Sequence, residues 1–311
     1  MNEEINYNAI SKADFKKTTA NRGDSDAIVR PSISYWRNVV RRLKKNKVAV
    51  LTLAAILIVS LMAVFAPILS QYSYDTTNPA NKNLKPSAEH LFGTDSVGRD
   101  LRTRVWVGAR VSLLIGLGGA AIPQIIGIII GGVSGYFGGM VDVVIMRIID
   151  IGICIPQLIY ITFIMLFIGA GPSAIIIAIS MVSWMGGARG VRARMLQFRN
   201  REFVMAARTL GASPRHVIFR CILPNIMGQQ VVGISQAIPG AIFTEAYLSF
   251  IGLGVQSPMT SLGQLSQIGS TVFRVHPYQL ALPSVVICMT ILAFYLFGNC
   301  LRDALDPHMV N

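Results

Sequence analysis

The residues of this chain that could catalyse a reaction or hold a metal do not form the usual catalytic spacings. No G-x-x-x-x-G-K-[ST] phosphate-binding loop occurs, and the dipeptide Gly-Lys is absent. The H-E-x-x-H and G-x-S-x-G motifs of proteases and lipases are also absent. The four cysteines, Cys154, Cys221, Cys288 and Cys300, follow neither a metal nor a disulfide spacing. We therefore expect no catalytic residue, bound cofactor or metal in this chain.

Three ionisable residues lie inside long apolar runs, where a charge is costly and often functional. Glu245 could face a cavity across the membrane, or it could be hydrogen-bonded within a helix bundle. Arg147 and Asp150 are three residues apart and so share one helix face. We expect these two to pair with each other, with a role in a gate as the alternative.

Apolar runs of sufficient length must position these residues. The composition is 52% hydrophobic and only 14% charged, and a bilayer core needs roughly 20 apolar residues per helix. Six stretches satisfy this, at about 48–69, 111–134, 143–168, 173–189, 226–250 and 279–301. The breaker cluster 169–172 predicts an antiparallel hairpin of the third and fourth spans, and Pro123, Pro156 and Pro239 predict kinks. The expected fold is all-α and polytopic.

The net charge of +13 is unevenly distributed and indicates topology. Lys and Arg concentrate in 1–47 and 190–225, so we expect both termini in the cytoplasm, although the outer 71–110 loop is also partly basic. Residues 1–30 should be disordered. The stretch SYWRNVVRRLKKNK predicts a basic amphipathic helix on the inner leaflet; a charge cluster that only sets topology is the alternative. The expected domains are this 1–47 tail, the first span with its outer loop (48–110), and a core of 111–311.

The most regular polar stretch is 201–225, REFVMAARTLGASPRHVIFRCILPN. An apolar face repeats at helical spacing in its first part: Phe203, Ala206, Ala207 and Leu210. Gly211 stands where a left-handed C-cap would, and Ser213-Pro214 predict a second helix that Pro224 should end. A DNA-binding helix-turn-helix is disfavoured, because spans at both ends would keep it from a major groove. A plain connector on the lipid headgroups is the other alternative.

Two further motifs carry open alternatives. Gly127, Gly131, Gly135 and Gly139 recur every four residues, which suits either a moving contact with a partner or static packing inside one bundle. Residues 90–100 contain Gly-Thr-Asp and Gly-Arg-Asp turns. They would brace the next helix or contact a partner. A metal site there, from His90, Asp95 and Asp100, lacks residues to complete its ligand set.

Several of these residues carry a family resemblance. Met205-Ala206-Ala207, Gly211 and Cys221-Ile222-Leu223-Pro224 stand at the spacing of the signature E-A-A-x3-G-x9-I-x-L-P, and so resemble permease subunits of binding-protein-dependent ABC importers. Met205 replaces the usual Glu, and Cys221 the usual Ile. Three other segments resemble the second permease of the subfamily that imports dipeptides, oligopeptides and nickel: HLFGTDSVGRDLRTRVWVGARVSL (90–113), EAYLSFIGLGV (245–255) and LRDALDP (301–307). Ser261-Leu262-Gly263, where the subfamily often has Trp-Gly, favours oligopeptides.

The resemblance implies a type I ABC importer permease fold in a bacterial cell membrane. The helix at about 201–213 would be a coupling helix that docks on an ATPase subunit. The contact residues would be Glu202, Phe203, Ala206, Ala207, Arg208, Gly211 and Ser213. Partners would be a second permease, two ATPases that bind ATP and Mg, and an extracytoplasmic binding protein, with no nucleic acid. Glu245, Arg147 and Asp150 would lie along the pathway or its gate.

The function implied is ATP-driven import of peptides, with oligopeptides favoured and this chain forming half of the pathway. A dipeptide or nickel importer of the same subfamily is the alternative. A proton-coupled secondary transporter is a further alternative, and it would predict an inverted repeat, which the spans do not display.

Overall fold

A computed structural model describes residues 35–305 of the protein. The chain divides into two compact units, 1–38 and 39–311. Of the first unit, only the opening of helix α1 (Tyr35–Lys45) is described. The amphipathic helix expected near residue 40 is thus present, whereas the disorder expected for 1–30 lies outside the described residues.

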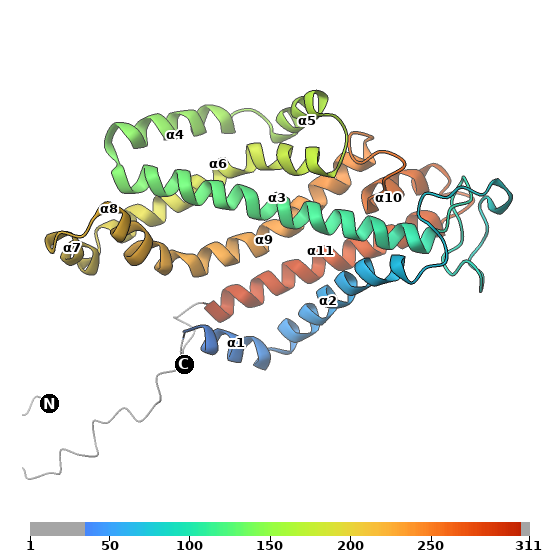
Figure 1. Ribbon diagram of the computed structural model, residues 1–311, viewed down its shortest axis with the longest axis horizontal. Helices are drawn as coiled ribbons and strands as arrows, with labels where there is room; N and C mark the ends of the chain where they lie inside the picture. Colours follow the sequence, from blue (N-terminus) through green and yellow to red (C-terminus); the bar gives the residue numbers. More distant parts are fainter. Residues whose placement is uncertain (1–34, 306–311) are drawn as a thin grey trace, which may run out of the picture. The chain divides into compact units, whose positions relative to one another are not determined.

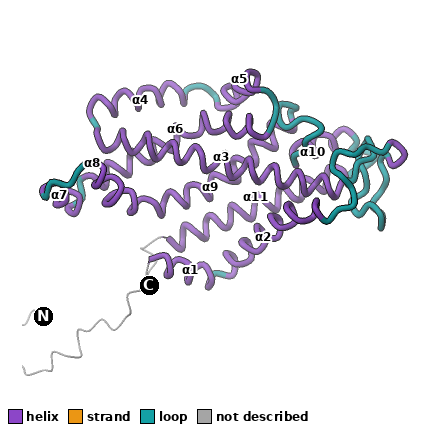
Figure 2. The backbone as a smooth tube through the Cα atoms, viewed as in Figure 1, coloured by secondary structure: helices purple, strands orange, loops and turns teal. Residues whose placement is uncertain are grey.

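From Val39 onward the described chain consists of helices joined by loops (Figure 2). The long helices are α2 (Lys47–Ile68), α3 (Leu101–Phe137), α6 (Pro172–Arg199), α9 (Leu223–Phe250) and α11 (Tyr278–Leu305). The shorter ones are η3 (Pro79–Asn81), α4 (Gly139–Ile153), α5 (Gln157–Ile168), α7 (Glu202–Thr209), α8 (Pro214–His216), the π-helical η4 (Val217–Ile222) and α10 (Leu262–Thr271). The long helices form a bundle in which α3 contacts α2, α6 and α9 (Figure 1).

Within residues 35–305, five helical stretches are long and apolar enough to cross a membrane, and the count rises to six if α4 and α5 together form one bent span. The span predicted over 143–168 thus consists of two helices, and the kink predicted at Pro156 is present as a full break. The chain bends by 89° between α4 and α5. Pro156 stands in the break, and proline removes a backbone donor and disfavours a helical residue before it. Pro123 and Pro239, in contrast, lie inside continuous helices.

Helix α3 begins well before the predicted start of the second span at residue 111. Asp100 is its N-cap, and the Asp100 carboxylate accepts a hydrogen bond from the backbone N–H of Thr103 at 2.8 Å. Such a cap satisfies one of the free donors of a helix end. The helix therefore includes residues 101–110, in which three arginines interrupt the apolar residues. Apolar periodicity alone did not indicate this earlier start.

The glycine stripe of α3 packs against α6. A Cβ atom at Gly127 would lie 2.9 Å from the backbone nitrogen of Ala188, and one at Gly131 would overlap the carbonyl oxygen of the same residue. At Gly135 the nearest atom would be Cβ of Met195, at 2.7 Å. Three of the four glycines thus serve close packing within the chain. Gly139 has no such neighbour and begins α4.

The 90–100 motif forms a compact turn structure at the end of the bundle where α3 begins (Figure 1). The Asp95 carboxylate accepts hydrogen bonds from the backbone N–H of Val97 and Arg99 and from Nε of Arg99, the last at 2.7 Å. It also lies 3.2 Å from Nη1 of the fully buried Arg104. Asp95 is therefore engaged with arginines, while His90 contacts Asp100 at 3.0 Å.

The loop before α3 is also tied to the start of α11. Tyr278 donates its hydroxyl hydrogen bond to the carbonyl of Leu84 at 2.8 Å, and the Gln279 amide donates to the carbonyl of Thr94 at 3.0 Å. Gly98 lies directly against the backbone of Asn78, with no space for a side chain. These contacts fit the expectation of a brace for α3; contact of the motif with a partner stays a prediction.

Candidate functional site

Helix α7 lies with α8 at the end of the bundle opposite α10 (Figure 1). Glu202 occupies the first turn, where a carboxylate is favoured by the helix dipole. The helix ends at Thr209, and Gly211 follows with φ of +80°. The N–H of Ala212 then donates to the carbonyl of Ala207 at 3.0 Å, as in a glycine-based C-cap. The predicted helix and glycine elbow are confirmed.

The second helix begins as predicted but does not end at Pro224. Ser213 accepts a hydrogen bond from the N–H of His216 at 3.3 Å and so acts as the N-cap of α8. The chain then remains helical through η4 into α9. Pro224 lies in the first turn of α9, directly after a π-helical stretch. Proline lacks the N–H that an α-helix needs for its i to i−4 hydrogen bond. The wider π-helical turn before Pro224 changes this bonding pattern, so the chain can stay helical.

Val204 anchors α7 to the bundle, a role that no sequence pattern indicated. Its side chain is 0% exposed. It packs in a cluster with Tyr136, Val191, Met195, Val217, Ile222 and Ile226, which come from α3, α6, η4 and α9. The guanidinium of Arg208 lies over the ring of Tyr136, 5.1 Å from the ring centre, at a distance typical of cation–π contacts. Both ends of the short helix are therefore held in place.

The predicted contact residues lie on the outer side of α7 or in the turn that follows it. Glu202, Phe203, Ala206, Arg208, Gly211 and Ser213 are exposed, and Ala207 is half-buried. Large apolar side chains are also exposed here, and Leu210 reaches 88%. Apolar side chains that are exposed together on a non-membrane surface are typical of protein contacts. Met205, at the position of the usual Glu, is half exposed as well.

Glu245 lies inside the bundle and has no exposed surface. Its two carboxyl oxygens accept hydrogen bonds from Ser112 Oγ at 2.6 Å and from Ser249 Oγ at 2.9 Å. Ser112 also accepts from the N–H of Leu262 at 3.3 Å. The carboxyl group therefore links α3 and α9 to the start of α10. This arrangement agrees with the structural alternative considered for Glu245; a role in the pathway stays a prediction.

Asp150 does not pair with Arg147, so that expectation is wrong. Asp150 instead forms an ion pair with Arg189 of α6, with both side chains about half exposed. A second pair joins the same two helices, from Asp142 of α4 to Arg192 of α6. The reason is that α4 packs along α6, which brings an interhelical arginine to each acidic residue. Arg147 is exposed.

The long apolar helices define a multi-pass membrane protein, and α7 exposes apolar side chains at one end of it. Residues 108–311 match the family described as binding-protein-dependent transport system inner membrane component. Residues 34–86 match the N-terminal TM domain of oligopeptide transport permease C. The chain belongs to this family of transport-system inner membrane components, whose fold is the type I ABC permease fold.

Curated relatives agree over nearly the whole chain. An oligopeptide transport system permease protein OppC of Bacillus subtilis is 42% identical over 300 residues, which is 96% of this chain and 98% of the relative. A dipeptide transport system permease protein DppC of the same organism is 43% identical over 287 residues, 92% of this chain and 90% of the relative. OppC of Escherichia coli K12 is 40% identical over 276 residues, 88% and 91% of the two chains.

Proposed function

We propose that this chain is one of two different permease subunits of an ATP-driven peptide importer and that α7 transmits the work of a separate ATPase. Family membership supports the transporter class. The observation that carries the coupling role is the outer surface of α7, where Leu210 is 88% exposed beside Phe203 and Met205. Such a surface requires a partner to cover it.

The anchoring of α7 suits the transmission of force. Val204 fixes the helix to the ends of α3, α6 and α9, so a push on its outer face moves these helices with it. A loop without buried residues would absorb the same push by bending. The ATP and Mg would bind to the two ATPase subunits, since the chain contains no phosphate-binding loop.

The proposed orientation follows from the same docking surface. The ATPases would lie in the cytoplasm, and α7, the start of α2 and the end of α11 lie toward one end of the bundle (Figure 1). The basic residues of 190–225 then lie on the inner side of a bacterial cell membrane. The loop of residues 70–100 would face outward, toward an extracytoplasmic binding protein that delivers the cargo.

The proposed cargo is a peptide, with oligopeptides favoured by the Ser261-Leu262-Gly263 stretch. A dipeptide importer is the second candidate, because a relative named for dipeptide transport is 43% identical. Competition for uptake separates the two. A labelled pentapeptide should be displaced by unlabelled tetra- and pentapeptides, whereas displacement by dipeptides alone would favour the second candidate.

The coupling role is tested by purifying the tagged chain with its associated subunits. We expect Leu210→Asp to reduce the co-purified ATPase by about tenfold. In the complex, the apolar contact of Leu210 with the ATPase would be replaced by a carboxylate removed from water. Leu91→Asp is the control, since Leu91 is also exposed but lies in the loop at the other end of the bundle. Equal recovery of ATPase with both variants would contradict docking on α7.

A further inference from the structure

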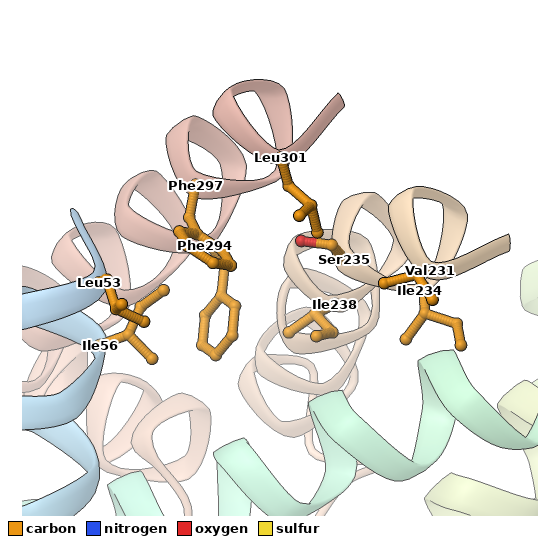
Figure 3. Close-up of a pocket in the computed structure, with 9 residues that line it drawn as sticks. All are labelled: Leu53, Ile56, Val231, Ile234, Ser235, Ile238, Phe294, Phe297 and Leu301. Atoms are coloured by element: carbon orange, nitrogen blue, oxygen red, sulfur yellow. The ribbon is translucent and has the colours of Figure 1, made fainter. Parts of the chain in front are cut away.

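An apolar groove runs between α2, α9 and α11 (Figure 3). Its volume is about 270 Å³, and it is lined by Leu53, Ile56, Val231, Ile234, Ser235, Ile238, Phe294, Phe297 and Leu301. The only polar side chain among these is that of Ser235. Leu53 at the rim is 42% exposed, so the groove opens to the side of the bundle, where lipid lies.

Basic residues lie directly beyond one end of this groove. Leu301 lines the groove and also packs with Val39 and Leu43 of α1. The guanidinium of Arg42 donates to the carbonyl of Ala304 at 3.5 Å, one turn further along α11. Helix α1 is thus fixed at the mouth of the groove.

Positive charge dominates this mouth. Residues 39–47 contain no carboxylate, and their basic residues are Arg41, Arg42, Lys44, Lys45 and Lys47. The end of α11 adds one residue of each sign, Arg302 and Asp303. Lys47 precedes Leu53 by six residues, which is about 9 Å along a helix. A phosphate near Lys47 would therefore be within an acyl chain's reach of the groove.

We propose that this groove and the basic residues at its mouth form a binding site for an anionic phospholipid, with one acyl chain in the groove and its phosphate beside α1. Juxtamembrane Lys and Arg residues attract anionic headgroups. Their long side chains extend toward the headgroup level while their stems cover apolar surface. None of the residues that line the groove belongs to α7.

The shape of the groove favours an acyl chain over a helix of a second permease. Helices that pack closely in membranes meet at small residues, whereas the rims here are Leu53, Ile56 and Phe297. Small residues occur instead on another exposed face of α9, at Ala237 and Gly240, and a Cβ added at Gly240 would meet nothing within 4 Å. That face, and not the groove, suits contact with a helix.

Photocrosslinking tests the site in the full-length chain purified with its associated subunits. The probe is phosphatidylglycerol with a photoreactive acyl chain, in nanodiscs of phosphatidylcholine; phosphatidylcholine with the same acyl chain is the comparison. We expect phosphatidylglycerol to label peptides of α2, α9 and α11 that line the groove, in preference to phosphatidylcholine. Leu53→Trp should remove this labelling. Leu57→Trp, one turn along the same helix and also exposed, should not.

Charge variants leave the groove itself intact and so test the site even if Leu53→Trp fails to assemble. Lys44→Gln with Lys45→Gln should lower labelling by phosphatidylglycerol by about fivefold for each charge removed. Lys82→Gln with Lys85→Gln, at exposed lysines of the 70–100 loop, should leave it unchanged. Labelling that is spread evenly over exposed apolar surfaces, or is insensitive to these lysines, would overturn the proposal. So would groove labelling that is found with this chain purified alone but is lost in the complex with its associated subunits, because the groove would then be a subunit contact.

Discussion

At the scale of single residues, Glu245 shows how burial changes the meaning of a charged residue in a span. Sequence position alone left two roles open, because any carboxyl group in an apolar run is a candidate for function. The structure surrounds it with Ser112 and Ser249, and Ser112 in turn contacts the first residue of α10. Ser249 lies one helical turn from Glu245, but Ser112 comes from a distant helix, so no local pattern could have assigned Ser112 to Glu245.

A pair of substitutions separates the two roles of Glu245. Glu245→Ala leaves two buried hydroxyl groups without their acceptor and opens a cavity, so we expect a loss of about 2–4 kcal/mol in unfolding free energy. Glu245→Gln keeps the size and an acceptor oxygen, and should retain most stability and peptide uptake. Thermal unfolding in detergent and uptake in vesicles are the measurements. A Gln variant of normal stability that transports nothing would instead indicate a role for the charge in the pathway.

At the scale of elements, the long apolar helices were predictable because each satisfies the bilayer by its own length and composition. A kink at Pro156 was predictable as well, but the full break between α4 and α5 was not, since an apolar stretch of span length with one proline is compatible with a kinked or a broken helix. The helix α7 and its apolar residues could be predicted from the spacing of its motif. Its anchor Val204 could not, because the partners that bury it come from four separate segments.

The contact of α3 with α6 gives a prediction at this scale. Gly131→Ala places a methyl group on the carbonyl oxygen of Ala188, so the helices must separate, at a cost of about 1–3 kcal/mol. Gly186→Ala is the matched control, because Gly186 lies in α6 with nothing within 4 Å of the added Cβ. It should be neutral or slightly stabilising, since alanine favours helix more than glycine does.

Thermal unfolding of the two purified variants in detergent is the measurement. Equal melting temperatures would contradict the close α3–α6 contact. A Gly131→Ala protein of unchanged stability that no longer assembles with a second permease would show that the stripe is a contact between subunits, the alternative left open by the four-residue spacing.

At the scale of the whole molecule, the bundle separates two tasks along its length. One end carries the exposed α7 surface with its buried anchor, and the other carries the braced loop of residues 70–100 and α10 (Figure 1). Helices α3 and α9 run between the two ends. Each contributes residues to a buried apolar cluster near both of them. A movement imposed on α7 can therefore reach the opposite end through continuous helices.

The most direct test of this account is ATP-driven uptake of a labelled oligopeptide into proteoliposomes that hold the purified complex. Uptake should require ATP, persist when a protonophore collapses the proton gradient, and fall at least tenfold for Gly211→Trp, because a bulky side chain is strained at φ of +80° and obstructs the docking surface. The variant should still insert and fold. Uptake that proceeds without an ATPase subunit, stops with the protonophore while ATP remains, or is unchanged by Gly211→Trp would contradict the account.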